Sequence, residues 1–272
     1  MATDQNNATP GMNLDNIDAI VLLDKSGSMD TKDVKGNSRW NAGKESISAF
    51  AEALAEHDDD GITLVFFDDS YQVVDHTTPE KVEEIFSKRS PGGSTMLAAP
   101  LKKIIDMFLP AVAEEKDEDI FENRPDPNYV APAAAPAKKG RWFGSLFGGS
   151  SEPAAPAPAP TVRVKTGTRK VKTGNYVRQS PAKQVFICIL TDGAAGDEST
   201  VINVLRDATK RINSRRDLGL LFVQVGEDSS AEAFLDRLNN NLQGDFDIVA
   251  VEKLESLEGL TTEQIIAKAF TE

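Results

Sequence analysis

The chain has 272 residues, of which 40% are hydrophobic, and a formal net charge of −13 at pH 7. That length is enough for one large domain with additional segments. Its one cysteine excludes a disulfide framework, and such a composition is typical of a reducing compartment. No apolar run approaches the roughly 18 residues of a membrane span, and the polar residues 1–11 lack the apolar centre of a signal peptide. We therefore expect a soluble, cytoplasmic protein without a transmembrane segment.

The first predicted element is a strand that ends in a cluster of polar side chains. The apolar run over residues 17–23 is typical of a strand that is buried on both faces. Asp24, Ser26 and Ser28 follow it in the pattern D-x-S-x-S, and Gly27 allows the backbone to turn tightly there. Closely placed oxygen ligands suit a hard divalent cation, Mg²⁺ above all, and suit zinc or copper poorly.

Alternating helix and strand patterns follow as far as residue 112. Apolar residues at helical spacing predict helices, and runs rich in β-branched and aromatic residues predict strands. A tight turn at Asp68-Asp69-Ser70 predicts a hairpin with an antiparallel edge strand. The predicted elements are a helix over 39–56, strands over 62–67 and 71–74, a helix over 79–86, and a helix over 97–112 that bends or ends near Pro110.

Two later segments present polar residues that would complete the cation site. A glycine-rich loop over residues 90–97 places Thr95 directly before a predicted helix, and a buried-strand pattern over residues 185–190 leads to Asp192. Ligands of parallel sheets bind beyond the carboxyl ends of the strands, so these residues are expected near Asp24. The alternative for each residue taken singly is an ordinary turn or helix cap, because Ser, Thr and Asp beside glycine often have that role.

An insert, residues 113–183, interrupts the alternating pattern. Residues 125–160 are rich in Pro and Ala and cannot bury enough apolar surface to become ordered, while residues 161–183 alternate in a way that predicts a small hairpin. Residues 132–183 carry ten Lys or Arg and one acid, a net +9, whereas the rest of the chain carries 20 and 42, a net −22. These basic residues have three interpretations: a solvated tether, binding to an acidic face of the same or a neighbouring domain, and contacts with nucleic-acid phosphates or an anionic membrane.

One part of the insert combines basic and large apolar side chains. Such an island is typical of a short docking motif that becomes ordered when it binds a partner. The alternative is an apolar patch that folds back on the domain. The residues of the predicted docking motif are Arg141, Trp142, Phe143, Leu146 and Phe147.

The alternation of strands and helices resumes over residues 184–272. Cys188 lies within an apolar strand pattern and is expected to be a buried, inert thiol. Together with residues 15–112, this part predicts one α/β domain with a doubly wound, mostly parallel sheet, helices on both faces and one antiparallel edge strand. Residues 1–14 are expected to be disordered. The predicted elements are strands over 185–190, 219–225 and 245–251, and helices over 200–214, 231–238 and 261–270.

The combination of D-x-S-x-S, a loop threonine and a later aspartate resembles the metal-ion-dependent adhesion site of von Willebrand factor type A domains. The resemblance covers residues 15–108 and 183–270 and implies a Rossmann-like three-layer sandwich. It implies that the serines and the threonine bind a divalent cation directly and that the acids bind it directly or through water. The cation would be Mg²⁺, with Mn²⁺ or Ca²⁺ as alternatives, and an open coordination position would bind an Asp or Glu of a protein partner. The implied metal ligands are Asp24, Ser26, Ser28, Thr95 and Asp192.

This resemblance implies a protein-interaction module and not an enzyme. The chain lacks a phosphate-loop motif and the G-x-S-x-G motif of hydrolytic serines, and no catalytic residue is predicted. Two alternatives stay open at this point. One is a hydrolase or phosphoryl-transfer enzyme that uses the same cation, and the other is a nucleic-acid tether through the basic insert.

Among type A domains, the chain is similar to intracellular bacterial members of the tellurium-resistance and stress-response type. The residues that carry this similarity are 24–29, Arg39-Trp40, 221–226, 233–238 and 246–249. Outside the metal motif these are packing residues, so they indicate kinship more than function. The similarity implies that the protein binds its partner in a bacterial tellurium-resistance or stress-response system.

Overall fold

The computed structural model describes residues 13–55, 57, 61–131 and 158–271. They fall into two compact units, one formed by the described residues up to 112 and from 175 onwards, the other by those between 113 and 174. The predicted docking motif, residues 141–147, lies outside the described residues, and so do residues 1–12 of the N-terminal segment.

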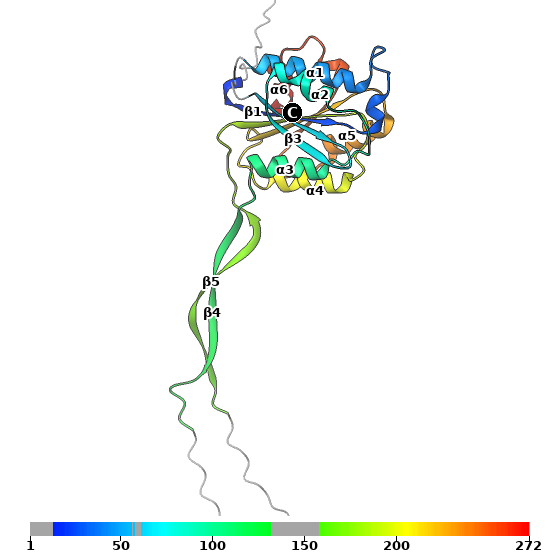
Figure 1. The fold of residues 1–272 in the computed structure, drawn as a ribbon. Coiled ribbons are helices and arrows are strands. Elements are labelled where there is room, and N and C mark those ends of the chain that lie inside the picture. Colours follow the sequence, from blue (N-terminus) through cyan, green and yellow to red (C-terminus); the bar gives the residue numbers. More distant parts are fainter. Residues whose placement is uncertain (1–12, 56, 58–60, 132–157, 272) are drawn as a thin grey trace, which may run out of the picture. The chain divides into compact units, whose positions relative to one another are not determined.

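The larger unit is built on six strands: β1 (Ile17–Asp24), β2 (Ile62–Phe67), β3 (Tyr71–Thr77), β6 (Gln184–Thr191), β7 (Leu218–Gln224) and β8 (Val249–Lys253). They form one sheet, which Figure 1 shows between two layers of helices, and the order of its strands is β3-β2-β1-β6-β7-β8. Strand β3 is antiparallel to β2 at the edge of the sheet, and the other neighbouring strands pair in parallel. The predicted α/β fold, with a mostly parallel sheet and an antiparallel edge strand, is therefore confirmed.

Helices cover both faces of this sheet: α1 (Arg39–Leu54), α2 (Pro79–Ser87), α3 (Ala98–Phe108), α4 (Glu198–Thr209), α5 (Ser229–Asn241) and α6 (Thr262–Thr271). Helices α1, α2 and α6 pack with one apolar core, and α3, α4 and α5 pack with a second core on the opposite face. Short 3-10 helices lie at η1 (Leu14–Asn16), η2 (Gly27–Asp30) and η3 (Leu254–Leu257). In the described ranges, none of the helices is long and apolar enough to span a membrane.

Strands β1 and β6 are neighbours in the centre of the sheet, where side chains are buried on both faces. Leu22 pairs with Ile189 and Leu23 with Leu190 in parallel register, and none of these four residues is more than 3% exposed. Burying each such side chain stabilises the fold by about 1.5–3 kcal/mol. The strand order reverses between β1 and β6, and the carboxyl ends of strands at such a switch point are where ligands bind in open α/β sheets.

Some elements begin or end at residues other than those predicted. Strand β3 continues to Thr77 because its backbone stays paired with β2 as far as Ile62. Helix α3 ends at Phe108, since Pro110 lacks the N–H that a further helical turn needs. Strand β8 begins at Val249, where its pairing with β7 begins.

The smaller unit contains a two-stranded ribbon formed by β4 (Ala113–Pro125) and β5 (Thr161–Tyr176). The expectation of a small hairpin within residues 161–183 is wrong, because β5 is one continuous strand and its partner is β4. Ion pairs of 2.7 Å join Asp119 to Lys165 and Glu118 to Arg169 across the ribbon. The sequence did not indicate β4 because six of its 13 residues are acidic, and acids are depleted in strands. Here the basic residues of β5 offset their charge.

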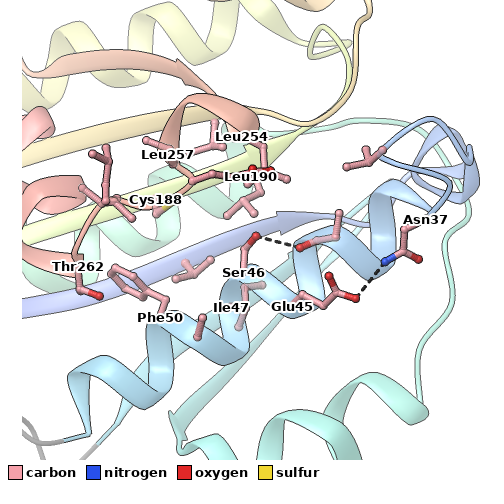
Figure 2. A pocket seen from close by; sticks show the side chains of 18 of the residues that line it. Asn37, Glu45, Ser46, Ile47, Phe50, Cys188, Leu190, Leu254, Leu257 and Thr262 are labelled. Atoms are coloured by element: carbon pink, nitrogen blue, oxygen red, sulfur yellow. Dashed lines mark hydrogen bonds between the residues drawn. The ribbon is translucent and has the colours of Figure 1, made fainter.

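A cavity of about 570 Å³ lies between α1, the sheet, η3 and α6 in the larger unit (Figure 2). Ile47 and Phe50 of α1 line it together with Leu254 and Leu257 of η3. Cys188 also lines it and is buried, as predicted, and burial raises the pKa of its thiol to about 12. None of the predicted metal ligands lines this cavity.

A buried ion-pair network joins α3 to the end of α4 and supports one stability prediction. Arg211 donates hydrogen bonds to Asp106 (2.6 Å) and Asp207 (2.5 Å), and its side chain is 4% exposed. We expect Arg211→Met to lower the free energy of unfolding by about 2–3 kcal/mol, because it leaves two carboxylates without this cationic partner. The loss is limited because water partly screens both carboxylates. Urea denaturation at neutral pH measures this loss, and Lys102→Met, which removes an exposed partner of Asp106, is the control with little expected effect.

The stability of the wild type and that of Arg211→Met should respond differently to acid. Burial acts to raise the pKa of Asp106, but hydrogen bonds from Lys102 and Arg211 outweigh it and hold this pKa below its ordinary value of 3.8. A lowered pKa in the folded state contributes stability above 3.8, and this contribution is lost as the pH falls through the folded-state value. The difference between wild type and Arg211→Met should therefore shrink in acid. An equal difference at neutral and acidic pH would contradict this account.

Candidate metal centre

Asp24 lies at the end of β1, where the chain turns into η2. Its carboxylate is fully buried, and its two oxygens accept hydrogen bonds from the backbone N–H of Ser26 and the hydroxyl of Thr191, each at 2.8 Å. Ser26 precedes η2 and Ser28 lies within it, so their hydroxyl oxygens are 3.1 Å apart. The D-x-S-x-S turn thus brings a carboxylate and two hydroxyls together at the carboxyl end of β1.

The glycine-rich loop brings Thr95 to the same place. The backbone N–H of Gly92 donates to the carbonyl of Lys25 at 2.7 Å, and the N–H of Gly27 donates to the carbonyl of Gly93 at 3.1 Å. These two hydrogen bonds fix the loop against the turn that follows β1. The Thr95 hydroxyl then lies 3.4 Å from Oδ2 of the buried aspartate.

Two acids outside the predicted donor set hold this loop in position. Gly93 has a φ of +81°, and a Cβ at this position would lie 2.7 Å from a carboxylate oxygen of Asp69, so the loop requires glycine here. The carboxylate of Asp197 accepts the backbone N–H groups of Leu97 and Ala98 at 3.0 and 2.9 Å. It therefore caps the start of α3, directly after Thr95.

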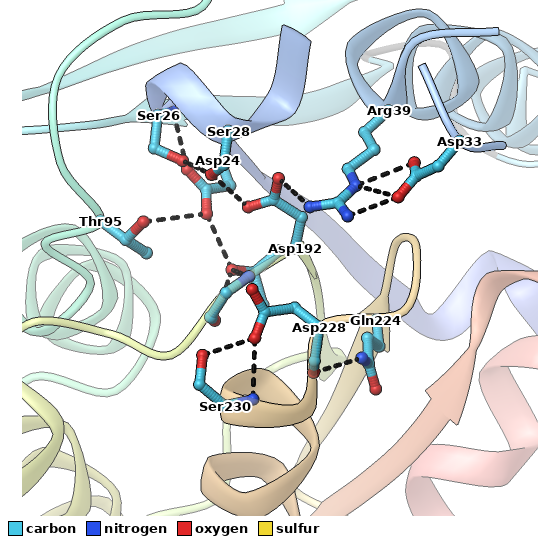
Figure 3. Close-up of polar contacts among 12 residues, drawn as sticks. Asp24, Ser26, Ser28, Asp33, Arg39, Thr95, Asp192, Gln224, Asp228 and Ser230 are labelled. Atoms are coloured by element: carbon cyan, nitrogen blue, oxygen red, sulfur yellow. Dashed lines mark hydrogen bonds and ion pairs between the residues drawn. The ribbon is translucent and has the colours of Figure 1, made fainter. Parts of the chain in front are cut away.

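Asp192 follows β6 and faces the turn after β1. Its buried carboxylate accepts the Ser28 hydroxyl at Oδ1 (2.8 Å) and the Nη1 of Arg39 at Oδ2 (2.9 Å). Arg39 is the first residue of α1, and its Nε donates to both carboxylate oxygens of Asp33, at 3.0 and 3.1 Å. Arg39 thus bridges two acids and orients Asp192 so that its other oxygen points toward Ser28 (Figure 3).

The five predicted metal ligands therefore lie together at the carboxyl ends of β1 and β6 (Figure 3). Neighbouring donor oxygens are separated by 2.8 to 3.4 Å. In an octahedral Mg²⁺ site with ligands at about 2.1 Å, neighbouring oxygens are about 3 Å apart. An oxygen-only donor set with this spacing fits a cation of that size. The residues that could hold it are Asp24, Ser26, Ser28, Thr95 and Asp192.

The two buried acids have different electrostatic surroundings. Asp192 forms an ion pair with Arg39, whereas within the described residues Asp24 has no cationic side chain at ion-pair distance. Burial raises the pKa of Asp24 to about 6, although hydrogen bonds from Ser26 and Thr191 act in the opposite direction, and the nearby carboxylate of Asp192 raises it further. An ionised carboxylate buried without a positive partner is costly, so a bound cation would stabilise it.

Hydroxyl groups outnumber acids in this donor set. Across the described ranges, no group of three or more His, Cys, Asp and Glu side chains is placed to hold a metal ion. The site instead offers two carboxylates and three hydroxyls. A divalent cation that binds there keeps more positive charge than in an all-carboxylate cage.

The comparison with known families adds to this geometry. Residues 19–121 match a von Willebrand factor type A domain. The matched residues include both serines, Asp24 and Thr95, and the match ends before Asp192. It supports a type A domain protein and, in general terms, a protein-interaction module.

Some solved structures are also similar to the chain. Eighteen chains match, among them the D319A mutant of the PilB minor pilin from Streptococcus sanguinis, with 12% sequence identity and a TM-score of 0.45. The likeness covers 98% of this chain and 62% of the pilin chain, so this chain spans less than two thirds of the pilin's length. No curated protein matches the chain.

Three positions that support the donor residues of the candidate site were not identified from the sequence. Thr191 had a usable signal, because a hydroxyl at the end of a fully buried strand requires a hydrogen-bond acceptor. Arg39 had none, since its partners Asp33 and Asp192 are 6 and 153 residues away along the chain. Asp197 looks like an ordinary loop acid until the start of α3 is placed beside it.

Lys25 lies between two of the predicted ligands in the sequence but does not belong to the donor set. Its ammonium group forms an ion pair with Asp68, at the turn between β2 and β3. The hydrogen bonds to Asp68 from Lys25 and Ser70 outweigh the effect of burial and hold the pKa of that carboxyl below its usual range. The Lys25 charge is thereby directed away from the position that a cation would take.

Proposed function

We propose that this chain is a metal-dependent protein-interaction module that holds Mg²⁺ at the site described above and binds an acidic residue of a protein partner. The observation that carries this proposal is the convergence of five oxygen donors from three segments far apart in sequence. Mn²⁺ and Ca²⁺ also bind oxygen ligands, so they are the expected substitutes.

In this proposal, Ser26, Ser28 and Thr95 bind the cation through their hydroxyl oxygens. Asp24 supplies the negative charge, and Asp192 accepts a hydrogen bond from the hydroxyl of Ser28 and so orients that ligand. When bound, the cation supplies a Lewis-acid centre that can coordinate the carboxylate of a partner. This arrangement needs no catalytic base, and we propose no enzymatic reaction.

Arg39 adjusts the charge of the proposed site. Because it forms an ion pair with Asp192, the cation would be close to one carboxylate that lacks a cationic partner instead of two. A divalent ion beside a single net negative charge remains positive overall and attracts an incoming carboxylate. The ion pair is therefore consistent with recognition of an acidic partner residue.

The smaller unit gives little support to nucleic-acid binding as the function. The ribbon strands β4 and β5 together carry seven basic and six acidic residues, so their net charge is 7 − 6 = +1. This value covers different residues from the +9 found for 132–183, which excludes the acidic strand. Affinity for phosphates increases with the number of Lys and Arg that neutralise them, and acidic neighbours in β4 form ion pairs with Lys165 and Arg169.

The broader role is proposed from the resemblance stated for the sequence. Arg39-Trp40, residues 221–226 at the end of β7 and residues 233–238 within α5 resemble those of bacterial type A proteins of the tellurium-resistance and stress-response type. We therefore place the proposed partner binding in such a system, in the cytoplasm.

Capture of a partner from a bacterial lysate tests the proposed function. The immobilised full chain is expected to retain a protein in MgCl₂ and to release it in EDTA. Thr95→Ala should lose this capture, because it removes one donor without changing the charge. Ser94→Ala is the matched control: its hydroxyl bonds to Asp69, outside the donor set, so capture should persist. Equal capture in EDTA, or by Thr95→Ala, would contradict the proposal.

A further inference from the structure

The ribbon formed by β4 and β5 has no hydrophobic core of its own. No described residue between 113 and 174 is among the buried hydrophobic residues of the chain. A single two-stranded ribbon is marginally stable in water, and it usually needs a further strand or a packed face. The ribbon therefore has the features of an incomplete sheet.

Each strand of the ribbon also has an open edge. Within the described residues, β4 and β5 pair only with one another, so each has an outer edge without a neighbouring strand. The strands are 13 and 16 residues long, longer than the usual range of about 3–10 residues. Unpaired N–H and C=O groups along such an edge are a template for another strand.

The two outer edges carry opposite charges. Strand β4 has six acids and two basic residues, while β5 has five basic residues and no acid. Charges on edge strands commonly prevent pairing, and like charges that face one another across two strands are destabilising. Here an acidic edge and a basic edge attract one another, so these charges favour association between copies.

Apolar side chains are exposed on both strands of the ribbon. Ile120, Phe121 and Val164 are 39%, 41% and 37% exposed, and the guanidinium of Arg163 lies 4.1 Å from the centre of the Phe121 ring. An added strand about 4.8 Å away would cover part of these side chains, and cross-strand apolar pairs stabilise sheets. The edge charges would select the partner strand, and apolar contacts would add to the affinity.

We propose that two copies of this chain associate through their ribbons, with the β4 edge of one copy beside the β5 edge of the other. This inference does not depend on the metal site. The contact is heterologous, because it joins two different edges, and it leaves one acidic and one basic edge open in the assembly. Growth beyond a dimer at high concentration is therefore expected.

Charge reversal on one strand at a time tests this proposal. The first variant combines Glu115→Lys with Asp117→Lys on β4, and the second combines Lys170→Glu with Lys172→Glu on β5. All four side chains are exposed. Sedimentation velocity of the full chain in EDTA and low salt should show self-association of the wild type, and about 1 M NaCl should weaken it. Each variant alone should associate more weakly than the wild type, because the net charge of β4 changes from −4 to 0 in the first variant and that of β5 from +5 to +1 in the second.

An equimolar mixture of the two variants distinguishes lost edge pairing from misfolding of the ribbon. The first variant retains the basic β5 edge and the second retains the acidic β4 edge, so the mixture should associate more strongly than either variant alone. Misfolded ribbons would not be rescued in this way. Lys103→Glu with Lys210→Glu gives the same charge change as the β5 variant, on exposed residues of the larger unit, and should leave association unchanged. A wild type that stays monomeric in low salt, single variants that associate as strongly as the wild type, or a mixture that associates no more strongly than either variant alone would each overturn the proposal.

Discussion

Replacing Asp24 with asparagine is expected to abolish Mg²⁺ binding and to leave the fold intact. Substituting a residue that only hydrogen-bonds to a metal ligand typically reduces metal affinity by about 10–100-fold, so removal of the central carboxylate should reduce it by at least about 100-fold. The metal-free variant should be as stable as the wild type or more stable, because asparagine removes a charge that is buried without a cationic partner.

Thermal unfolding with and without MgCl₂ measures both parts of this prediction. A cation that binds the folded state stabilises it by about 2.7 kcal/mol when its concentration is 100 times the dissociation constant. The wild type should show a concentration-dependent rise in Tm, and Asp24→Asn should show none. Asp30→Asn is the matched control, because Asp30 is exposed at the end of η2 and the charge change is the same. A rise in Asp24→Asn equal to that of the wild type would contradict the proposed site.

The second large effect is expected at Arg39. Replacing it with methionine removes the ion-pair partner of a fully buried carboxylate, so the metal-free protein should lose about 3–5 kcal/mol of stability. Two buried carboxylates without cationic partners would then lie beside the proposed cation position. Because Coulomb attraction to a cation increases with this added negative charge, Mg²⁺ should stabilise Arg39→Met more than it stabilises the wild type.

Urea denaturation in EDTA and in MgCl₂ separates these two expectations. Arg39→Lys keeps a positive charge but cannot bridge both acids, so its loss of stability should be smaller. Asp33→Asn removes the outer, partly exposed acid of the bridge and should change the Mg²⁺ response little. If Arg39→Met were destabilised equally in EDTA and in MgCl₂, Arg39 would have a structural role but no electrostatic coupling to a cation.

The fold could be predicted from the sequence where buried elements have a recognisable pattern of apolar residues. Strands β1, β6 and β7 are buried along nearly their whole length, so their continuous apolar runs identify them without reference to the rest of the chain. Strand β4 has no such pattern. Its acids are stabilised in a strand by the basic residues of β5, which follow more than 35 residues later in the sequence, and local propensity does not report such long-range pairing.

The same distinction between local and long-range signals applies to the candidate site. Its donors lie at the ends of buried strands or beside glycine, and both signals are local, so these residues could be proposed from the sequence alone. The groups that position the donors are different: Arg39 reaches Asp192 across 153 residues, and Asp197 caps α3 from a loop about 100 residues further along the chain. Contacts of this kind depend on the packing of the sheet and its helices and become visible only in three dimensions.

The central claim is that residues from three distant segments share one cation. Paramagnetic broadening by Mn²⁺ in the amide NMR spectrum of the full chain tests it most directly. We expect the amides of Gly27, Gly93 and Gly193, one beside each segment, to lose intensity together at low Mn²⁺, and excess Mg²⁺ to restore them. Broadening that begins at the acidic strand β4, or that affects only one of the three glycines, would contradict a shared site.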